Sequence, residues 1–360
     1  AISSARVLCI GDVMMDRFVY GAIDRISPEA PIPVLLVERE KHMLGGAGNV
    51  AANLAALGVK TQLIAVVGND AIGLEIQKQL EEIGVAVALE IATDRTSTIK
   101  SRFVCGTQQM LRVDRENTAS ISADVEYKII ARIEKEISGV GAVILSDYKK
   151  GMLTDNVISA TIACARRHGV PVIVDPKGSD FVRYRGATVL TPNRKELETA
   201  TGMKAGTDDE VRAAALKLIM ACDVDMVLAT RSKDGMSLIA RDDVPVHIPA
   251  EVREVFDVSG AGDTVIATFA AGIAGGLSMK TSAMLANTAA GIVVGKPGTA
   301  TVHLDEIQDA LESSSGVPTK RATMQKAALL AERARARGLK VGFTNGCFDL
   351  IHPGHISLLQ

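Results

Sequence analysis

Residues 141–148 read GAVILSDY, an apolar run that ends in polar residues. The same pattern recurs in PVIVDPKG (171–178), ATVLTPN (187–193) and DMVLATRS (225–232). Continuous apolar runs of this length indicate strands buried on both faces, which is typical of a parallel sheet. Ligands of open α/β sheets bind beyond the carboxyl ends of the strands, so the polar ends of these runs are where we expect the site.

Strand patterns alternate with helix patterns along most of the chain. ARVLCIGD (5–12) and TQLIAVVGND (61–70) predict strands, and NVAANLAALG (49–58) predicts a helix that Gly58 closes. Residues 71–84 have apolar side chains at helical spacing and predict an amphipathic helix. This alternation predicts an α/β fold with an open, mostly parallel sheet flanked by helices.

Two segments break the alternation. Residues 17–40 and 96–116 show strand patterns and turn residues without a helix between them, and they predict a small antiparallel sheet that forms a lid or a dimer surface. SSSGVP (313–318) predicts a linker. The expected organisation is therefore a domain over residues 1–312, the linker, and the start of a second domain over 319–360.

Composition narrows the classes of function. The formal net charge of the 360 residues is −2, which gives no general attraction to nucleic acid or lipid. Residues 319–340 hold seven Lys or Arg against one Glu but no aromatic residue, so a solvated helix face is favoured over nucleic-acid binding. The five scattered cysteines indicate reduced thiols, and the apolar run Val265–Leu277 is too short to span a bilayer. Together with the absence of a signal-peptide pattern at the N-terminus, these features predict a cytoplasmic protein.

The segment VSGAGDTVIATFAAG (258–272) places one carboxylate, Asp263, directly after a glycine-rich turn. Gly260, Ala261 and Gly262 leave their backbone amides open to an anion, and a helix that begins near Thr264 would add the positive end of its dipole. An acid at this position can take a proton from a hydroxyl group that attacks a phosphate. The alternative, that Asp263 only caps the helix, has equal weight on this segment alone.

Two further strand ends carry features that suit phosphate chemistry. Asn193 and Glu196 in TPNRKELE (191–198) could hold a hydrated Mg²⁺ through water, or they could form a turn and a helix cap. Thr230, Ser232 and Gly235 in TRSKDG (230–235) could contact a nucleotide, or they could form an ordinary hairpin turn. The sequence has neither the GxxxxGK[ST] pattern of a P-loop nor a GxGxxG after the first strand, so those two nucleotide folds are disfavoured.

The order of GGAGNVAANLAALG (45–58), NRKE (193–196), TRSKDG and DVSGAGDT (257–264) resembles the ribokinase-like (PfkB) carbohydrate kinases over residues 1 to about 312. The resemblance implies that Asp263 is the catalytic base and that the backbone of Gly260–Gly262 forms the anion hole. It also implies that Asn193 and Glu196 organise Mg²⁺ and that Thr230 to Gly235 line the site of the co-substrate ATP. Ser232 stands where the family usually has a glycine.

The same resemblance implies the sugar-binding residues. Asp16, with Asp12 nearby, would hold substrate hydroxyls together with Gly45, Gly46 and Asn49. Asn287 and the GKPG turn (295–298) follow the expected Asp263 helix, where the family contacts adenine, although helix packing and a surface turn explain them equally well. The family also admits a monovalent cation.

A second motif, TNGCFDLIHPGH (344–355), resembles the opening of the cytidylyltransferase-like nucleotidyltransferases. That resemblance implies that His352 and His355 stabilise nucleotide phosphates, and it makes residues 319–360 the start of a Rossmann-like domain. The two histidines could instead bind zinc, but Pro353 and Gly354 spoil a helix between them and the sequence offers no other ligand cluster.

GDVMMDRFVYG (11–21), LSDYKKGML (145–153) and DPKGSDFVRYRGATVLTPN (175–193) resemble heptose 7-phosphate kinases of lipopolysaccharide synthesis. This resemblance implies ATP-dependent phosphorylation of a heptose 7-phosphate at O1, followed in a longer protein by adenylylation. A substrate that already carries a phosphate needs cations, for which Lys100, Arg102, Arg112 and Lys177 are candidates, although each could be an ordinary exposed charge. The alternatives are another PfkB kinase, for fructose 1-phosphate or a nucleoside, and a nucleotidyltransferase with a sugar-binding upstream domain. The exposed edge strand of the lid predicts a homodimer.

Overall fold

The computed structural model describes residues 2–106, 108–251, 256–296 and 298–314, with isolated positions between 324 and 342. The chain forms two compact units, Ala1–Ala310 and Leu311–Gln360, and both sheets and the candidate site belong to the first. Residues 315–318 of the predicted linker, together with His352 and His355, lie outside the described residues.

The four apolar runs at 141–148, 171–178, 187–193 and 225–232 form adjacent strands of one sheet. The described residues contain a nine-stranded sheet in the order β13-β12-β11-β10-β9-β8-β1-β4-β5. Its pairs are parallel except β11–β12 and β12–β13, which are antiparallel, so the predicted open, mostly parallel sheet is confirmed. The strand bounds are β1 (Arg6–Gly11), β4 (Lys60–Gly68), β5 (Ala86–Ala92), β8 (Ala142–Ser146), β9 (Val172–Asp175), β10 (Val189–Leu190), β11 (Met226–Thr230), β12 (Met236–Ala240) and β13 (Val246–Ile248).

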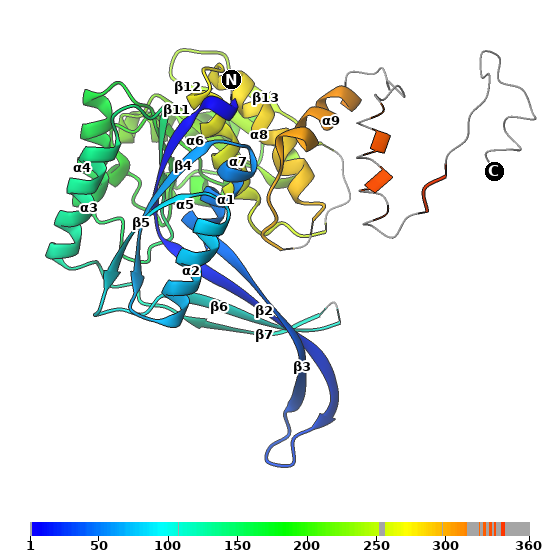
Figure 1. The fold of residues 1–360 in the computed structure, drawn as a ribbon. Helices are drawn as coiled ribbons and strands as arrows, with labels where there is room; N and C mark the ends of the chain where they lie inside the picture. Colours follow the sequence, from blue (N-terminus) through cyan, green and yellow to red (C-terminus); the bar gives the residue numbers. More distant parts are fainter. Residues whose placement is uncertain are drawn as a thin grey trace, which may run out of the picture. The chain divides into compact units, whose positions relative to one another are not determined.

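Helices cover the main sheet on both sides. Figure 1 shows α3 and α4 together on one side and α1, α7 and α8 together on the other. No described helix is long and apolar enough to cross a membrane. The helix bounds are α1 (Ala47–Ala56), α2 (Ala71–Glu82), α3 (Ala123–Glu136), α4 (Asp155–Arg167), α5 (Arg194–Thr201), α6 (Asp208–Cys222), α7 (Ala261–Ala274), α8 (Met279–Val293) and α9 (Leu304–Ser314).

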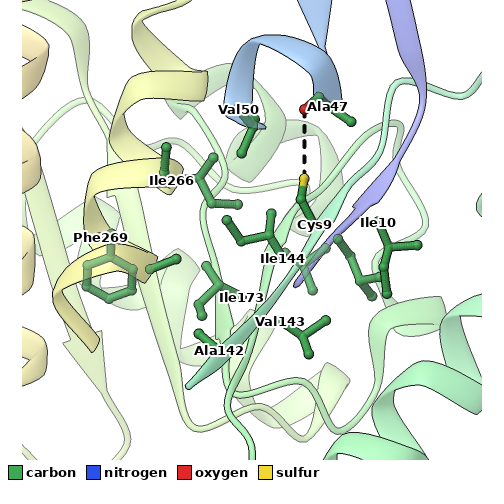
Figure 2. Close-up of a cluster of buried hydrophobic side chains, with 14 of the residues drawn as sticks. Cys9, Ile10, Ala47, Val50, Ala142, Val143, Ile144, Ile173, Ile266 and Phe269 are labelled. Carbon is green, nitrogen blue, oxygen red and sulfur yellow. Dashed lines mark hydrogen bonds between the residues drawn. The ribbon is translucent and has the colours of Figure 1, made fainter. Parts of the chain in front are cut away.

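The core between the sheet and α7 fixes the position of the site. Figure 2 shows Ile144 and Ile173 of neighbouring strands close to Ile266 and Phe269 of α7, and all four side chains are fully buried. Burying a large apolar side chain stabilises the fold by roughly 1.5–3 kcal/mol. Because these contacts hold α7 against the strands, its N-terminus is held near their carboxyl ends.

The predicted lid exists as a second sheet with the order β3-β2-β6-β7. Its strands are β2 (Val13–Ile26), β3 (Pro33–Gly46), β6 (Thr98–Cys105) and β7 (Gln108–Arg115), and the long β2–β3 hairpin projects away from the main body (Figure 1). The expectation that this sheet is purely antiparallel is wrong, because β2 pairs with β6 in parallel. A parallel pair needs a long crossover, and the chain between β3 and β6 supplies it by passing through α1, β4, α2 and β5.

Candidate active site

The glycine turn before Asp263 shapes the start of α7. Gly260 is the N-cap of this helix and has a φ of 78°, a left-handed conformation that glycine adopts without strain. Because the turn ends there, α7 begins at Ala261, and the expected start near Thr264 is wrong by three residues. Asp263 therefore lies inside the first turn of the helix, and the alternative in which it is the N-cap is also wrong.

The carboxylate of Asp263 is bound by side chains from two other elements. Asn49 of α1 donates from Nδ2 to Oδ2 at 2.7 Å. Tyr148, which follows β8, donates from its hydroxyl to Oδ1 at 2.6 Å. Asp263 is only 5% exposed. The structure thus holds a buried acid by two tertiary hydrogen bonds rather than by the local bonds of a helix cap.

The surroundings of Asp263 shift its acidity toward neutral pH. Burial raises its pKa to about 6, although the hydrogen bonds from Tyr148 and Asn49 lower it. The charge of Asp16 raises the pKa further, and the charge of Lys100 lowers it. A carboxyl group with a pKa near neutral pH is suited to general-base catalysis, because it is ionised at working pH yet basic enough to take a proton.

A cavity of about 140 Å³ opens beside the N-terminus of α7. It brings together Asn193, Glu196 and Thr230 of the predicted nucleotide site and Gly262 of the predicted anion hole, from three separate segments of the chain. The other residues that line it are Asp147, Tyr148, Asp175, Lys177, Thr191 and Val265. The helix dipole and the exposed backbone of Gly262 favour an anion such as phosphate at this end of the cavity.

Asn193 and Glu196 form the helix cap that was the alternative for this motif. Asn193 Oδ1 accepts from the amide of Glu196, and Glu196 Oε2 accepts from the amide of Asn193, which together form a capping box at the start of α5. Lys177 Nζ lies 2.7 Å from Glu196 Oε1. The cap does not remove either side chain from the cavity, so a structural and a ligand-binding role are compatible here.

Several predicted sugar-site residues lie close to Asp263 and to one another. Asp16 is buried and forms an ion pair with Arg102, whose guanidinium lies 5.1 Å from the centre of the Phe18 ring. Gly45 packs so closely on Asp16 that a Cβ there would collide with the carboxylate. Lys100 Nζ is 5.9 Å from the centre of the Tyr148 ring. The predicted sugar-binding group is therefore assembled around Asp263 from strands of the lid.

Other predicted residues have different surroundings. Asp12 accepts hydrogen bonds from three backbone amides of the loop after β8. Asn287 donates to the carbonyl of Pro249 at 2.9 Å, as the helix-packing alternative requires. Arg112 pairs with Asp114 at 3.1 Å on the exposed strand β7. Lys177 lies in the cavity beside Glu196, with the nucleotide-site candidates.

The TRSKDG segment joins β11 to β12 as an antiparallel hairpin. Ser232 has a φ of 53° in this turn, which is the left-handed conformation that explains why a glycine is usual there. Gly235 also has a positive φ, and a side chain at this position would collide with the backbone of Ile248. The hairpin thus has the ordinary turn geometry of the alternative while Thr230 still lines the cavity.

Sequence reasoning missed three residues of the site, Asp147, Tyr148 and Asp175. Each follows or ends a buried strand, so the strand-end signal that selected Asp12 and Asn193 was present for them too. Burial raises the pKa of Asp175 well above its usual range, and the nearby charge of Asp263 raises it further.

A parallel α/β sheet with a β lid, and an acid at a helix N-terminus beside a polar cavity, define the ribokinase-like class of fold. The structure is similar to Arabidopsis thaliana ribokinase complexed with ribose and ATP, with a TM-score of 0.69 and 21% identity over 86% of this chain and 99% of that one. It is also similar to phosphofructokinase-2 from Escherichia coli in complex with potassium, with a TM-score of 0.74 and 19% identity over 86% and 99% of the two chains.

Comparison of the sequence gives the family. The pfkB family carbohydrate kinase profile matches residues 4–306. The chain is 51% identical over 363 residues to the bifunctional protein HldE of Rhodospirillum rubrum, covering 100% of this chain and 73% of that protein. It is 49% identical over 364 residues to the bifunctional protein HldE of Caulobacter vibrioides, covering 100% and 75%. The chain belongs to the pfkB family and is a carbohydrate kinase.

Proposed function

We propose that this kinase transfers a phosphoryl group from ATP to O1 of D-glycero-β-D-manno-heptose 7-phosphate, which gives the 1,7-bisphosphate used to make ADP-heptose for lipopolysaccharide. The observation that carries the proposal is the buried carboxylate of Asp263, which is close to Asp16 of the lid and bonded to Tyr148, a residue that lines the cavity at the start of α7. The choice of heptose is supported by the three heptose-kinase-like segments and by the identity of about 50% to the two HldE proteins.

The chemistry assigned to the chain's own residues is simple. The hydroxyl at O1 loses its proton to Asp263 as its oxygen forms a bond to the γ-phosphorus, and ADP leaves with the electrons of the broken P–O bond. The amides of Gly260 and Gly262 and the dipole of α7 stabilise the charge on the transferring group, whereas the amide of Ala261 donates to the carbonyl of Val258 at 3.3 Å. Asp16 and Asn49 orient the sugar, and Lys100 and Arg102 attract its distal phosphate.

The donor set of the cavity fits Mg²⁺ held through water. Among the described residues, no group of three or more His, Cys, Asp or Glu could hold a metal ion directly. Asn193 and Glu196 nevertheless present oxygen atoms to the cavity, and Mg²⁺ usually keeps several waters and few protein ligands. When bound, the ion would neutralise phosphate charge, and Asn193 and Glu196 would orient its waters.

The proposal includes a homodimer formed through the lid. Leu36 is 65% exposed, Leu111 is 56% exposed and Val113 is 48% exposed, and all three are on lid strands. Exposed apolar side chains on both edge strands of the lid sheet support an interface with a second copy of the chain.

The test is Asp263→Asn, assayed for ADP formation with a panel of sugar phosphates and for the position of the new phosphate by phosphorus NMR. We expect the wild type to phosphorylate heptose 7-phosphate at O1, and the variant to fold and bind ATP while its turnover falls by roughly 10³-fold or more. Asp209→Asn on the exposed face of α6 is the matched control and should keep full activity. If Asp263→Asn keeps its turnover, the assignment of Asp263 as the catalytic base is refuted.

The same panel separates the alternatives. Arg102→Ala should raise the KM of a phosphorylated sugar by roughly tenfold or more, and raise the KM of an unphosphorylated sugar less. If the enzyme prefers fructose 1-phosphate or a nucleoside, the proposed heptose substrate is wrong and the chain is a different kinase of the same family. Release of pyrophosphate by this chain would instead favour a nucleotidyltransferase, and we expect none.

A further inference from the structure

We propose that Tyr148 is a positioning residue for the catalytic base and that Asp12 holds Tyr148 in place through the backbone of residues 148–152. The inference rests on the proposed function, because it assigns a role toward Asp263 as the base. The sequence predicted no role for Tyr148. For Asp12 it predicted a direct contact with the sugar.

The geometry at the carboxylate carries the first half of the proposal. Tyr148 donates to one oxygen of Asp263 at 2.6 Å and Asn49 donates to the other at 2.7 Å. Two donors from different elements fix both the rotamer and the plane of the carboxylate. Each oxygen can accept more than one hydrogen bond, so both can still accept from the sugar hydroxyl.

The loop that carries Tyr148 is held by Asp12, at the end of β1. Asp12 Oδ2 accepts from the amides of Tyr148 and Lys150, both at 2.9 Å, and Oδ1 accepts from the amide of Met152 at 3.2 Å. Asp12 is 3% exposed, and charge-assisted bonds to a buried carboxylate are stronger than neutral ones. Asp12 binds the loop through all three of these hydrogen bonds, which supports a structural role for Asp12.

Arg95 and Gly151 also fix the loop. Arg95 donates to the carbonyl of Lys150 at 2.8 Å and to that of Ala119 at 2.9 Å. Gly151 has a φ of 87° and packs against the backbone of Ala119 so closely that a side chain there would collide with it. The loop is therefore held between Asp12 and Arg95, and the tyrosine hydroxyl has a defined position relative to α7.

The charged groups around Asp263 determine the protonation state of the Tyr148 hydroxyl. Asp16 on β2, Lys100 on β6, Asp175 on β9 and the Cys9 thiol on β1 are the groups coupled to this pair from the neighbouring strands. Burial, and then the charge of Asp263, raise the pKa of Tyr148 well above its usual range, so the hydroxyl stays protonated and donates at all working pH values. The sugar proton passes to Asp263, and Tyr148 keeps its own.

Tyr148→Phe tests the role, because it removes the donor and keeps the ring. We expect kcat to fall by roughly tenfold to a hundredfold while both KM values change by less than about threefold. A hydrogen bond to the ionised form lowers an acid's pKa, so the acid limb of the pH–rate profile should move up by about one pH unit. A variant with wild-type kcat and an unmoved acid limb overturns the proposal.

Two matched tyrosines separate positioning from stability. Tyr184 is also buried, and its hydroxyl donates to Asp147 at 2.7 Å, so Tyr184→Phe loses a comparable bond without touching Asp263. The acid limb of the pH–rate profile of Tyr184→Phe should coincide with that of the wild type. Tyr127, which is 74% exposed on α3, provides a Tyr→Phe control for unchanged activity. An equal shift of the acid limb in Tyr184→Phe would contradict the specific role of Tyr148.

Asp12→Asn tests the second half, because the amide group puts a donor against at least one backbone amide of the loop. We expect a fall in kcat with little change in the sugar KM, and the double variant with Tyr148→Phe should be less impaired than the product of the single effects. A raised sugar KM with intact kcat means that Asp12 contacts the sugar instead. If Asp263→Asn retains turnover, the proposed function fails; if Asp263→Asn is inactive while Tyr148→Phe is normal, only the positioning role fails.

Discussion

At Asp263, two opposing effects act on one carboxylate. Burial raises its pKa, and the hydrogen bonds from Asn49 and Tyr148 partly offset that effect. Asp263 could be selected as a candidate base from the glycine turn before it, because those residue types are local in the sequence, although the same turn allowed a helix cap equally well. Its two partners were not, since they lie 214 and 115 positions away and only packing brings them together.

The raised pKa of Asp263 predicts a pH-dependent cost to stability. Its pKa is about 6 in the folded chain against an ordinary value of 3.8, so between about pH 4 and 6 the folded state holds a proton that the unfolded state has released. Wild-type stability therefore falls as pH rises through that window, by on the order of 3 kcal/mol. Asp263→Asn lacks this ionisation and can still accept from Asn49 and donate to the Tyr148 oxygen.

Thermal unfolding across pH checks this expectation. At pH 7.5, Asp263→Asn should be more stable than the wild type, and the difference should shrink as pH falls through 6 toward 4. Asp209→Asn should show no such trend. A less stable Asp263→Asn at pH 7.5 would mean that the hydrogen bonds outweigh burial.

At the scale of elements, the site is built from strand ends and helix starts. The apolar runs and the glycine positions predicted the parallel strands, the hairpin after β11 and the lid strands, because burial on both faces of a sheet leaves a plain local pattern. The parallel pairing of β2 with β6 was missed because it depends on the route of the chain between them, which strand patterns do not encode. The same limit hid the loop after β8.

The capping role of Asn193 on helix α5 can be distinguished experimentally from its role in the ligand site. Asn193→Ala and Thr207→Ala each remove the cap of a capping box, on α5 and α6 respectively, and each should lower the free energy of unfolding by about 1 kcal/mol. Only Asn193 lines the cavity, so only its variant should need a higher Mg²⁺ concentration for half-maximal activity. Equal Mg²⁺ dependence in the two variants would leave Asn193 with a capping role alone.

At the scale of the molecule, the lid is where we expect a second copy to bind. Leu36→Glu places a charge among its exposed apolar side chains and should convert the dimer to a monomer in sedimentation experiments. Met220→Glu is the control, since Met220 is 72% exposed on α6, away from the lid. A wild-type monomer, or dissociation by both variants, would contradict the dimer through the lid.

Strand β2 begins in the main body and continues into the projecting β2–β3 hairpin. Its first residues, including Met14 and Met15, are buried in the body, and its end reaches Ile26, which is 62% exposed. A bulge interrupts its pairing with β3 between Tyr20 and Gly21, beyond Asp16. Because a strand bends most readily at such an irregularity, swaying of the hairpin tip would be absorbed there. Asp16 would then keep its alignment with the body while the far end moves.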